Sequence, residues 1–323
     1  MKLSRLEEKA LIDAIRAEFQ GTHPGLDLGI GDDAAVIETR KKKTVITKDL
    51  LIADVHFIER FHPPRLLGRK CLNVNLSDLA AMGAFPQFAL LGMGLPRKTD
   101  TEWIREFFAG FKSAAKQYGL GLIGGDITRA QKVTISVTLL GEAKNVIRRS
   151  DAKPGHRLFV SGSLGDAKEG LILMKKGIRL GRNRQEDRML KAFMDPKPQI
   201  ELGMDLARSQ VASAMIDTSD GLSTDLGHLC EASACGAEIC LEKLPVSDEL
   251  RALQRKARDF ALNGGEDYQL LFTVPETKLD ALKKLTKKYT FTPIGKMIEK
   301  KKIVVIDSRS RRKTLRPKPW HHF

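Results

Sequence analysis

The segment AMIDTSDGLSTDLGHL, from Ala214 to Leu229, contains a sharp change of pattern from strand to helix. The apolar run from Ala214 to Asp217 predicts a short strand, and the residues from Leu222 to Ala234 predict a helix. Between them lies the acidic motif DTSDG, which ends the strand and starts the helix. Strands and helices alternate in this way through both halves of the chain, which predicts an α/β or α+β protein.

The DTSDG motif has the residue types of a site for a phosphate group and its cation. Ser219 and the free N–H groups of the following helix are suited to an anion, while Asp217 and Asp220 are suited to a cation. N-capping of the helix by Thr218 or Ser219 is the simpler explanation, but it does not require both aspartates.

Four further acidic motifs occur along the chain, and no Walker-type phosphate loop accompanies them. They are GDD (Gly31 to Asp33), NLSD (Asn75 to Asp78), GGD (Gly124 to Asp126) and GGED (Gly264 to Asp267). Any one of them alone is most simply a solvated turn. Their repetition favours a hard divalent cation such as Mg²⁺, which takes oxygen ligands and bridges to substrate phosphates. The sequence therefore predicts a metal-assisted phosphate enzyme.

Two of these motifs have a predicted place in the secondary structure. NLSD lies in a predicted helix, where Asn75 and Asp78 share one face, and the alternative is a pair of local hydrogen bonds to the backbone. GGD is predicted to be a loop between two strands, whose glycines bring backbone N–H groups close to whatever Asp126 touches.

The domain organisation follows from length and from one linker. With 323 residues, of which 42% are hydrophobic, the chain has enough apolar mass for two cores. The segment from Arg148 to His156 is charged, contains Pro and Gly, and lies between predicted strands. We therefore expect two comparable lobes, residues 1–148 and 149–323. The polar segment from Arg179 to Arg188 predicts a loop in the second lobe.

Composition narrows the cellular context and the partners. The four cysteines form no CxxC pair, so neither a zinc site nor a disulfide framework is predicted, and a reducing cytoplasm fits best. The charged N-terminus predicts an amphipathic helix instead of a signal peptide, and the apolar stretch from Leu79 to Pro96 is too broken to span a membrane. The net charge of +15 raises nucleic acid as a partner, but no nucleic-acid motif accompanies it, and a basic surface also attracts nucleotides.

Seven segments, taken in order, resemble the thiamine-monophosphate kinase family, in the superfamily of AIR synthetase and selenophosphate synthetase. They are GIGDDAAV, DVHF (Asp54 to Phe57), NVNLSDLAAMGA, LIGGDITR, RRSDAKPG, IDTSDGLSTDLGH and LNGGEDYQLLF. The resemblance implies an AIR-synthetase-like fold with an N-terminal α/β lobe and a C-terminal α+β lobe. It also implies phosphoryl transfer from ATP to thiamine monophosphate, giving thiamine diphosphate and ADP.

The resemblance further implies the site residues. The Mg²⁺ ligands would be Asp33, Thr47, Asp49, Asp78, Asp126, Asp217 and Asp220. The ATP contacts would be Gly125, Asp126, Arg149 and Ser219, and the contacts with thiamine monophosphate would be His56, Glu266 and Trp320. A homodimer joined through the N-terminal lobes is implied as well, with ATP near that interface.

The three substrate contacts make chemical sense. An imidazole can donate to a phosphate, a carboxylate suits the aminopyrimidine or the cationic thiazolium, and an indole can stack on an aromatic cation. The alternatives are a structural role for His56 beside Phe57 and a role for Trp320 in fixing the C-terminus. Because the acceptor is already an ionised phosphate, no general base is expected, and catalysis should rest on alignment and charge neutralisation.

One position departs from the family pattern. Where the family shows two hydroxyl residues before an aspartate, this chain has Thr47, Lys48 and Asp49. A protonated lysine cannot ligate Mg²⁺, although its ammonium can replace part of a metal's charge beside a phosphate. We therefore expect activity with fewer ions.

Two alternative functions remain at the level of sequence. The first is another ATP-using member of the superfamily with a different acceptor, against which DVHF and GGED argue. The second is a non-catalytic, basic nucleic-acid binder that has kept the fold. The retained aspartates argue against it, because a retired site has no reason to hold so many repelling carboxylates.

Overall fold

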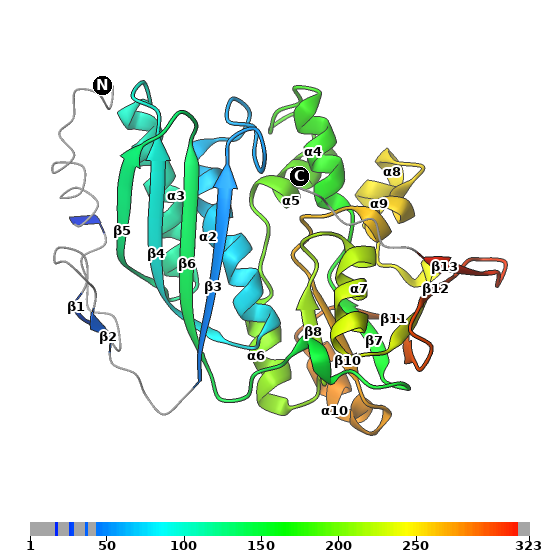
Figure 1. Ribbon diagram of the computed structural model, residues 1–323. Helices are drawn as coiled ribbons and strands as arrows, with labels where there is room; N and C mark the ends of the chain where they lie inside the picture. Colours follow the sequence, from blue (N-terminus) through cyan, green and yellow to red (C-terminus); the bar gives the residue numbers. More distant parts are fainter. Residues whose placement is uncertain (1–16, 19–25, 29–35, 38–42, 316–323) are drawn as a thin grey trace. The chain divides into compact units, whose positions relative to one another are not determined.

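The computed structural model describes residues 17–18, 26–28, 36–37 and 43–315 of the chain (Figure 1). They divide into two compact units, the first ending at Lys144 and the second beginning at Asn145, except that Ala80–Ala84 belong with the second. Both units combine helices with a sheet, which confirms the predicted fold class. In the described part of the chain, every helix is too short or too polar to cross a membrane.

The first unit is built on a four-stranded sheet. Its strand order is β3-β6-β4-β5, in which β6 runs antiparallel to both neighbours and β4 and β5 are parallel. A separate antiparallel pair is formed by β1 and β2. The elements are β1 (Leu26–Leu28), β2 (Val36–Ile37), β3 (Lys43–Ile52), α2 (Pro64–Ala81), β4 (Phe85–Leu95), α3 (Thr101–Gln117), β5 (Gly121–Arg129) and β6 (Thr134–Ala143).

This sheet has a covered face and an open face. On the covered face, Val137 and Leu139 of β6 are fully buried, and α2 and α3 both lie on that side (Figure 1). On the other face, Leu50 of β3 and Leu90 of β4 are 47% and 37% exposed. The described helices of this unit leave that face uncovered.

Two glycines set α2 tightly against α3. A Cβ atom added at Gly68 would lie 2.0 Å from the carbonyl oxygen of Phe107, and one added at Gly110 would lie 1.8 Å from that of Arg65. Because the two backbones are in direct contact at these points, larger residues would push the helices apart. The position of α2, which carries the NLSD motif, is therefore fixed by α3.

The second unit is built on a seven-stranded sheet of order β13-β12-β9-β11-β7-β10-β8, in which only the β9–β12 pair is parallel. Strand β10 is buried along its whole length. Phe159, Phe272 and Phe291 pack together at its centre, with ring centroids 5.6 to 5.9 Å apart.

The elements of this unit follow the linker in close succession. They are η2 (Arg149–Asp151), β7 (Arg157–Ser161), α4 (Asp166–Lys175), α5 (Arg184–Met194), α6 (Ile200–Ser209), β8 (Ala214–Asp217), α7 (Leu222–Ala232), β9 (Gly236–Cys240), η3 (Leu241–Lys243), α8 (Asp248–Leu253), α9 (Ala257–Asn263), β10 (Leu270–Val274), η4 (Glu276–Lys278), α10 (Leu279–Lys283), η5 (Lys284–Lys287), β11 (Phe291–Ile298), β12 (Ile303–Ile306) and β13 (Arg312–Leu315).

The predicted loop at 179–188 is wrong in its second half, because α5 begins at Arg184. Asn183 caps this helix by accepting a hydrogen bond of 2.8 Å from the N–H of Glu186. The charged residues at 184–188 form the first turns of an amphipathic helix whose later residues, including Leu190 and Phe193, are buried. In sequence, the polar first turns of an amphipathic helix resemble a loop.

Candidate active site

The first unit places three of the predicted metal ligands on one face of its sheet. Thr47 and Asp49 are two residues apart on β3, so their side chains point to the same face. The hydroxyl of Thr47 donates a hydrogen bond of 2.5 Å to Oδ2 of Asp78 on α2. A hydroxyl and two carboxylates are the oxygen donors that a hard cation prefers.

The NLSD motif lies in a helix, as predicted, and its two polar residues behave differently. The side-chain amide of Asn75 donates to the carbonyl of Cys71 at 3.0 Å, which is the local hydrogen bond of the simpler explanation. Asp78 instead contacts a distant strand through Thr47. It is half-buried, whereas the residues on either side of it in the helix are buried. Only the aspartate is therefore placed for a ligand.

Lys48 points away from this pair. Because side chains alternate along a strand, Lys48 lies on the open face of the sheet, opposite Thr138 of β6. Its ammonium donates a hydrogen bond of 2.6 Å to the hydroxyl of Ser136. The geometry gives Lys48 no part in the Thr47–Asp78 pair, and a hydroxyl residue at this position would face the same way.

The GGD motif lies inside strand β5, so the prediction of a loop is wrong. Gly125 pairs with Leu91 of the parallel strand β4, and a Cβ atom at Gly125 would lie 2.0 Å from the carbonyl oxygen of Leu91. The glycine therefore permits a close approach of two strands instead of a turn.

Asp126, the last residue of GGD, points to the open face of the sheet. It pairs with Gly92, which pairs in turn with Ser136, opposite Leu50. Its side chain is exposed. The structure therefore does not bring Asp126 to the face that carries Thr47 and Asp49.

His56 lies in a turn after β3 that is fixed by its neighbours. Asp54 has a left-handed φ of 65° and Phe57 is buried. The backbone N–H of Ile52 donates to Nδ1 of His56 at 3.0 Å. In the neutral imidazole this bond leaves the proton on Nε2, the tautomer that can donate to a phosphate oxygen. In this turn, Phe57 is the residue that packs into the core.

In the second unit, DTSDG joins strand β8 to helix α7, as predicted. The N-cap of α7 is Gly221, with a φ of 107° and no side-chain capping bond. The hydroxyl of Thr218 instead accepts from the backbone N–H of Gln269 at 3.0 Å. Helix capping by Thr218 is therefore wrong as an explanation of this motif.

The GGED motif, between α9 and β10, is bonded directly to DTSDG. The N–H of Glu266 donates to the carbonyl of Ser219 at 2.7 Å, and the N–H of Tyr268 donates to the carbonyl of Thr218 at 2.9 Å. A Cβ atom at Gly265 would lie 2.7 Å from the carbonyl oxygen of Ser219. The predicted ATP contact Ser219 and the predicted substrate contact Glu266 therefore lie on two turns that form one structural piece.

Asp225 is a carboxylate of this site that the sequence analysis missed. Burial, followed by the negative charges of Asp217 and Asp220, raises the pKa of Asp225 to about 9. Its Oδ2 atom is buried and has no hydrogen-bond partner within the described residues. The available signal was its place in the first turn of α7, where side chains lean back toward the helix start and so toward DTSDG.

Arg149 lies at the other end of α7. Its carbonyl accepts a hydrogen bond of 2.6 Å from the hydroxyl of Ser233, which follows the last residue of that helix. Ser219 precedes the first residue, and the eleven residues of α7 span roughly 16 Å. The two predicted ATP contacts are therefore attached near opposite ends of this helix.

Asp33 and Trp320, with the GDD motif and the predicted N-terminal helix up to residue 16, lie outside the described residues. Within the described residues, no three His, Cys, Asp or Glu side chains converge into a complete metal centre. What each unit presents is a partial set of oxygen donors.

Two family models match the chain in succession. One is the AIR synthase related protein N-terminal domain, over residues 31–143, and the other is the corresponding C-terminal domain, over residues 153–308. The two-unit fold with its acidic turns is therefore that of an AIR synthase-related protein.

Individual relatives narrow this class. The thiamine-monophosphate kinase of Aquifex aeolicus is 35% identical over 329 residues, covering 100% of both chains. The solved structure of the thiamine-monophosphate kinase from Stenotrophomonas maltophilia is 38% identical, with a TM-score of 0.84 over 93% of this chain and 96% of that one. AaThiL complexed with AMPPCP and TMP is 34% identical, with a TM-score of 0.80 over 100% and 99%. The chain belongs to the thiamine-monophosphate kinase family, which confirms the resemblance found in its motifs.

Proposed function

We propose that this chain transfers the terminal phosphoryl group of ATP to thiamine monophosphate, giving thiamine diphosphate and ADP. The observation that carries the proposal is the match along the whole chain to a thiamine-monophosphate kinase. A structural neighbour that holds AMPPCP, an ATP analogue, together with TMP supports the same pair of substrates. The oxygen-rich turns of this chain have the chemistry that such a reaction needs.

We assign the two substrates to separate sets of residues. ATP would contact Gly125, Asp126, Arg149 and Ser219, and thiamine monophosphate would contact His56, Glu266 and Trp320. The assignment of Ser219 is supported by its place two residues before Gly221, the N-cap of α7, because the start of a helix favours a phosphate. The assignment of His56 is supported by the hydrogen bond from the N–H of Ile52 to Nδ1, which leaves the proton of the neutral imidazole on Nε2.

Mg²⁺ is the proposed cofactor. Its ligands would be Asp33, Thr47, Asp49, Asp78 and Asp126 from the first half of the chain, and Asp217 and Asp220 from the second. The donor set fits a hard cation, because every ligand offers oxygen. Burial is the main cause of the raised pKa of Asp225, and the second cause, the negative charges of Asp217 and Asp220, fits a cation at the end of β8. When bound, the cation neutralises phosphate charge and polarises the transferred group.

The protein's own part in the reaction is alignment. The acceptor oxygen belongs to a phosphate monoester whose second pKa is about 6, so it is ionised at neutral pH and no residue has to remove a proton. Glu266 and Ser219, joined by one hydrogen bond, would hold acceptor and donor in a fixed relation. No residue is therefore assigned as a general base.

The assembly and location follow from the same reasoning. We infer domains at 1–148 and 149–323, and a homodimer joined through the sheet of the first unit, whose open face carries exposed Leu50 and Leu90. Sedimentation of a Leu50→Lys variant tests the dimer, and an unchanged mass would contradict it.

A cytoplasmic location is proposed because ATP is the donor and all four cysteines are free thiols.

The decisive experiment is an incubation of the purified protein with ATP, thiamine monophosphate and Mg²⁺, followed by chromatography. The expected products are thiamine diphosphate and ADP in equal amounts, and chelation of the metal should stop their formation. Thiamine in place of its monophosphate serves as the control acceptor, from which no thiamine diphosphate is expected. A folded protein that forms no product with any divalent cation would contradict the proposal.

A further inference from the structure

The GGED turn has a backbone that its own residues do not favour. Glu266 and Tyr268 have φ values of 72° and 51°, in the left-handed region that residues other than glycine rarely adopt. Such a conformation persists only where surrounding contacts determine it. The bonds to DTSDG fix one side of this turn, and a second contact is needed on the other side.

Asp267 supplies that contact from within the turn. Its side chain is only 8% exposed. Its Oδ2 accepts a hydrogen bond of 2.7 Å from the N–H of Gly165, and its Oδ1 accepts one of 3.4 Å from the N–H of Ala167. Gly165 is the N-cap of α4 and has no side chain to cap the helix. A carboxylate from a distant segment therefore takes the place of the local cap.

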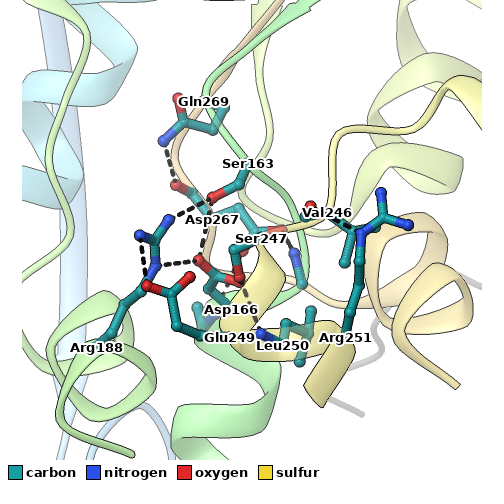
Figure 2. A network of polar contacts seen from close by, with 12 residues as sticks. Ser163, Asp166, Arg188, Val246, Ser247, Glu249, Leu250, Arg251, Asp267 and Gln269 are labelled. Carbon is teal, nitrogen blue, oxygen red and sulfur yellow. Dashed lines mark hydrogen bonds and ion pairs between the residues drawn. The ribbon is translucent and has the colours of Figure 1, made fainter. Parts of the chain in front are cut away.

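The start of α4 is a firm anchor for this carboxylate. Asp166 accepts hydrogen bonds from Ser247 at 2.6 Å and Ser163 at 3.1 Å, and Figure 2 shows these side chains around Asp267. Arg188 of α5 adds an ion pair to Asp166 at 3.3 Å. The amide of Gln269 donates to the carbonyl of Asp267 at 3.2 Å. The turn is thus held at its side chain and at its backbone.

No side chain at the N-cap position could make this contact in place of Asp267. Burial raises the pKa of Asp267 well above its usual range, although the N–H groups of Gly165 and Ala167 oppose the shift. A serine or asparagine at the N-cap could accept from the N–H of Ala167 but not from the N–H of Gly165 itself, and a Cβ atom at Gly165 would lie 2.7 Å from the backbone nitrogen of Ala261. The same two hydrogen bonds that satisfy the helix start therefore tie the 264–268 turn to α4.

We propose that Asp267 is a positioning residue, whose carboxylate, held by the N–H groups of Gly165 and Ala167, keeps the 264–268 turn in the conformation that presents Glu266 to thiamine monophosphate. The inference rests on the proposed function, in which Glu266 contacts that substrate. The carboxylate of Asp267 itself faces the helix start, where each of its oxygens accepts a backbone hydrogen bond.

The test is a double-mutant cycle on KM. Asp267→Asn removes one acceptor oxygen, and it is expected to raise KM for thiamine monophosphate about tenfold while KM for ATP changes less than about twofold. In a Glu266→Ala background the same substitution should change KM for thiamine monophosphate by less than about twofold, because the residue acts through Glu266. A purely structural role would lower the folded fraction and leave KM unchanged.

Asp166→Asn is the matched control, since it weakens the same helix start without touching the turn, and its KM should equal that of the wild type. An Asp267→Asn variant with normal KM, or one whose effect persists in the Glu266→Ala background, overturns the inference. If that variant does not fold, Asp267→Ser, which keeps one acceptor, goes through the same cycle. Wild-type protein that makes no thiamine diphosphate would contradict the proposed function instead, so the two failures are distinguishable.

Discussion

The two units hold their proposed ligand-binding residues in different kinds of structure. In the first, Thr47, Asp49 and Asp78 lie on a ten-residue strand and an eighteen-residue helix. In the second, Ser219 and Glu266 lie on two turns that hydrogen-bond to each other. The first arrangement depends on regular structure, so displacing it requires a change in strand or helix packing. The second depends on a few turn contacts, and it can be altered while the sheet stays folded.

The largest expected effect is a loss of turnover when the Asp78 carboxylate of the first unit is removed. Asp78→Asn should lower kcat about 1,000-fold, because it removes a negative charge from the proposed metal site, while the hydrogen bond from Thr47 is kept and the fold with it. Steady-state kinetics and circular dichroism measure the two outcomes. Asp280→Asn, on the exposed face of α10, is the control and should be as active as the wild type. Near-normal turnover in Asp78→Asn would remove this residue from the site.

The next effect is on stability, and it tests the dependence of the first unit on regular structure. Gly125→Ala places a methyl group 2.0 Å from the carbonyl of Leu91, which should lower the free energy of unfolding by about 3 kcal/mol. Gly124→Ala meets only the end of the Leu90 side chain, at 3.2 Å, and should stay within about 1 kcal/mol of the wild type. Urea unfolding measures both. Equal free energies of unfolding for the two variants would mean that the close approach of β4 and β5 does not restrict the residue at position 125.

A smaller, purely kinetic effect is expected in the second unit. Gly265→Ala places a methyl group 2.7 Å from the carbonyl of Ser219, so the two turns must separate. We expect kcat/KM for thiamine monophosphate to fall about tenfold, with an unfolding transition close to that of the wild type. Gly155→Ala, which strains an open turn with no atom within 4 Å, is the control for backbone strain alone. If Gly265→Ala unfolds the protein, the contrast between the units is wrong.

The smallest effect is a pH dependence of stability in the second unit. Burial, followed by the positive charge of Lys153, lowers the pKa of His156 below its usual value near 6.5. The unfolded chain therefore binds a proton more readily, so this stability is present above pH 6.5 and is lost as the pH falls through the folded-state pKa. His156→Gln should reduce the fall in Tm between pH 7.5 and 5.5 by about 2 °C. An identical pH profile in the variant would contradict this assignment.

The regular elements of the fold could be predicted from periodicity, and the exceptions have physical causes. Strand β8, at Ala214–Asp217, and helix α7, at Leu222–Ala232, lie where the sequence pattern places them. The GGD segment is a strand and not the predicted turn. Paired glycines usually mark a turn, but here Gly125 is needed because strand β4 approaches it too closely for a side chain. That requirement depends on which strand pairs with β5, and the residues around Gly125 do not reveal the pairing.

The candidate site divides in the same way. Residue types alone gave the oxygen donors of DTSDG and the chemistry that they serve. The bonds between Glu266 and Ser219 and between Asp267 and Gly165 join segments far apart in sequence. They also depend on a turn in which Glu266 and Tyr268 have left-handed φ values. Local propensity argues against that backbone conformation, so only the folded structure could place these turns together.

The hydrogen bond between Glu266 and Ser219 has a thermodynamic consequence. If the two proposed substrates contact Ser219 and Glu266, a ligand that shifts one turn also shifts the other, because backbone hydrogen bonds join them. Linkage makes the effect reciprocal: if ATP tightens the binding of thiamine monophosphate, the monophosphate tightens the binding of ATP by the same factor. The two backbone bonds between the turns would thus couple the binding of the two substrates within the second unit.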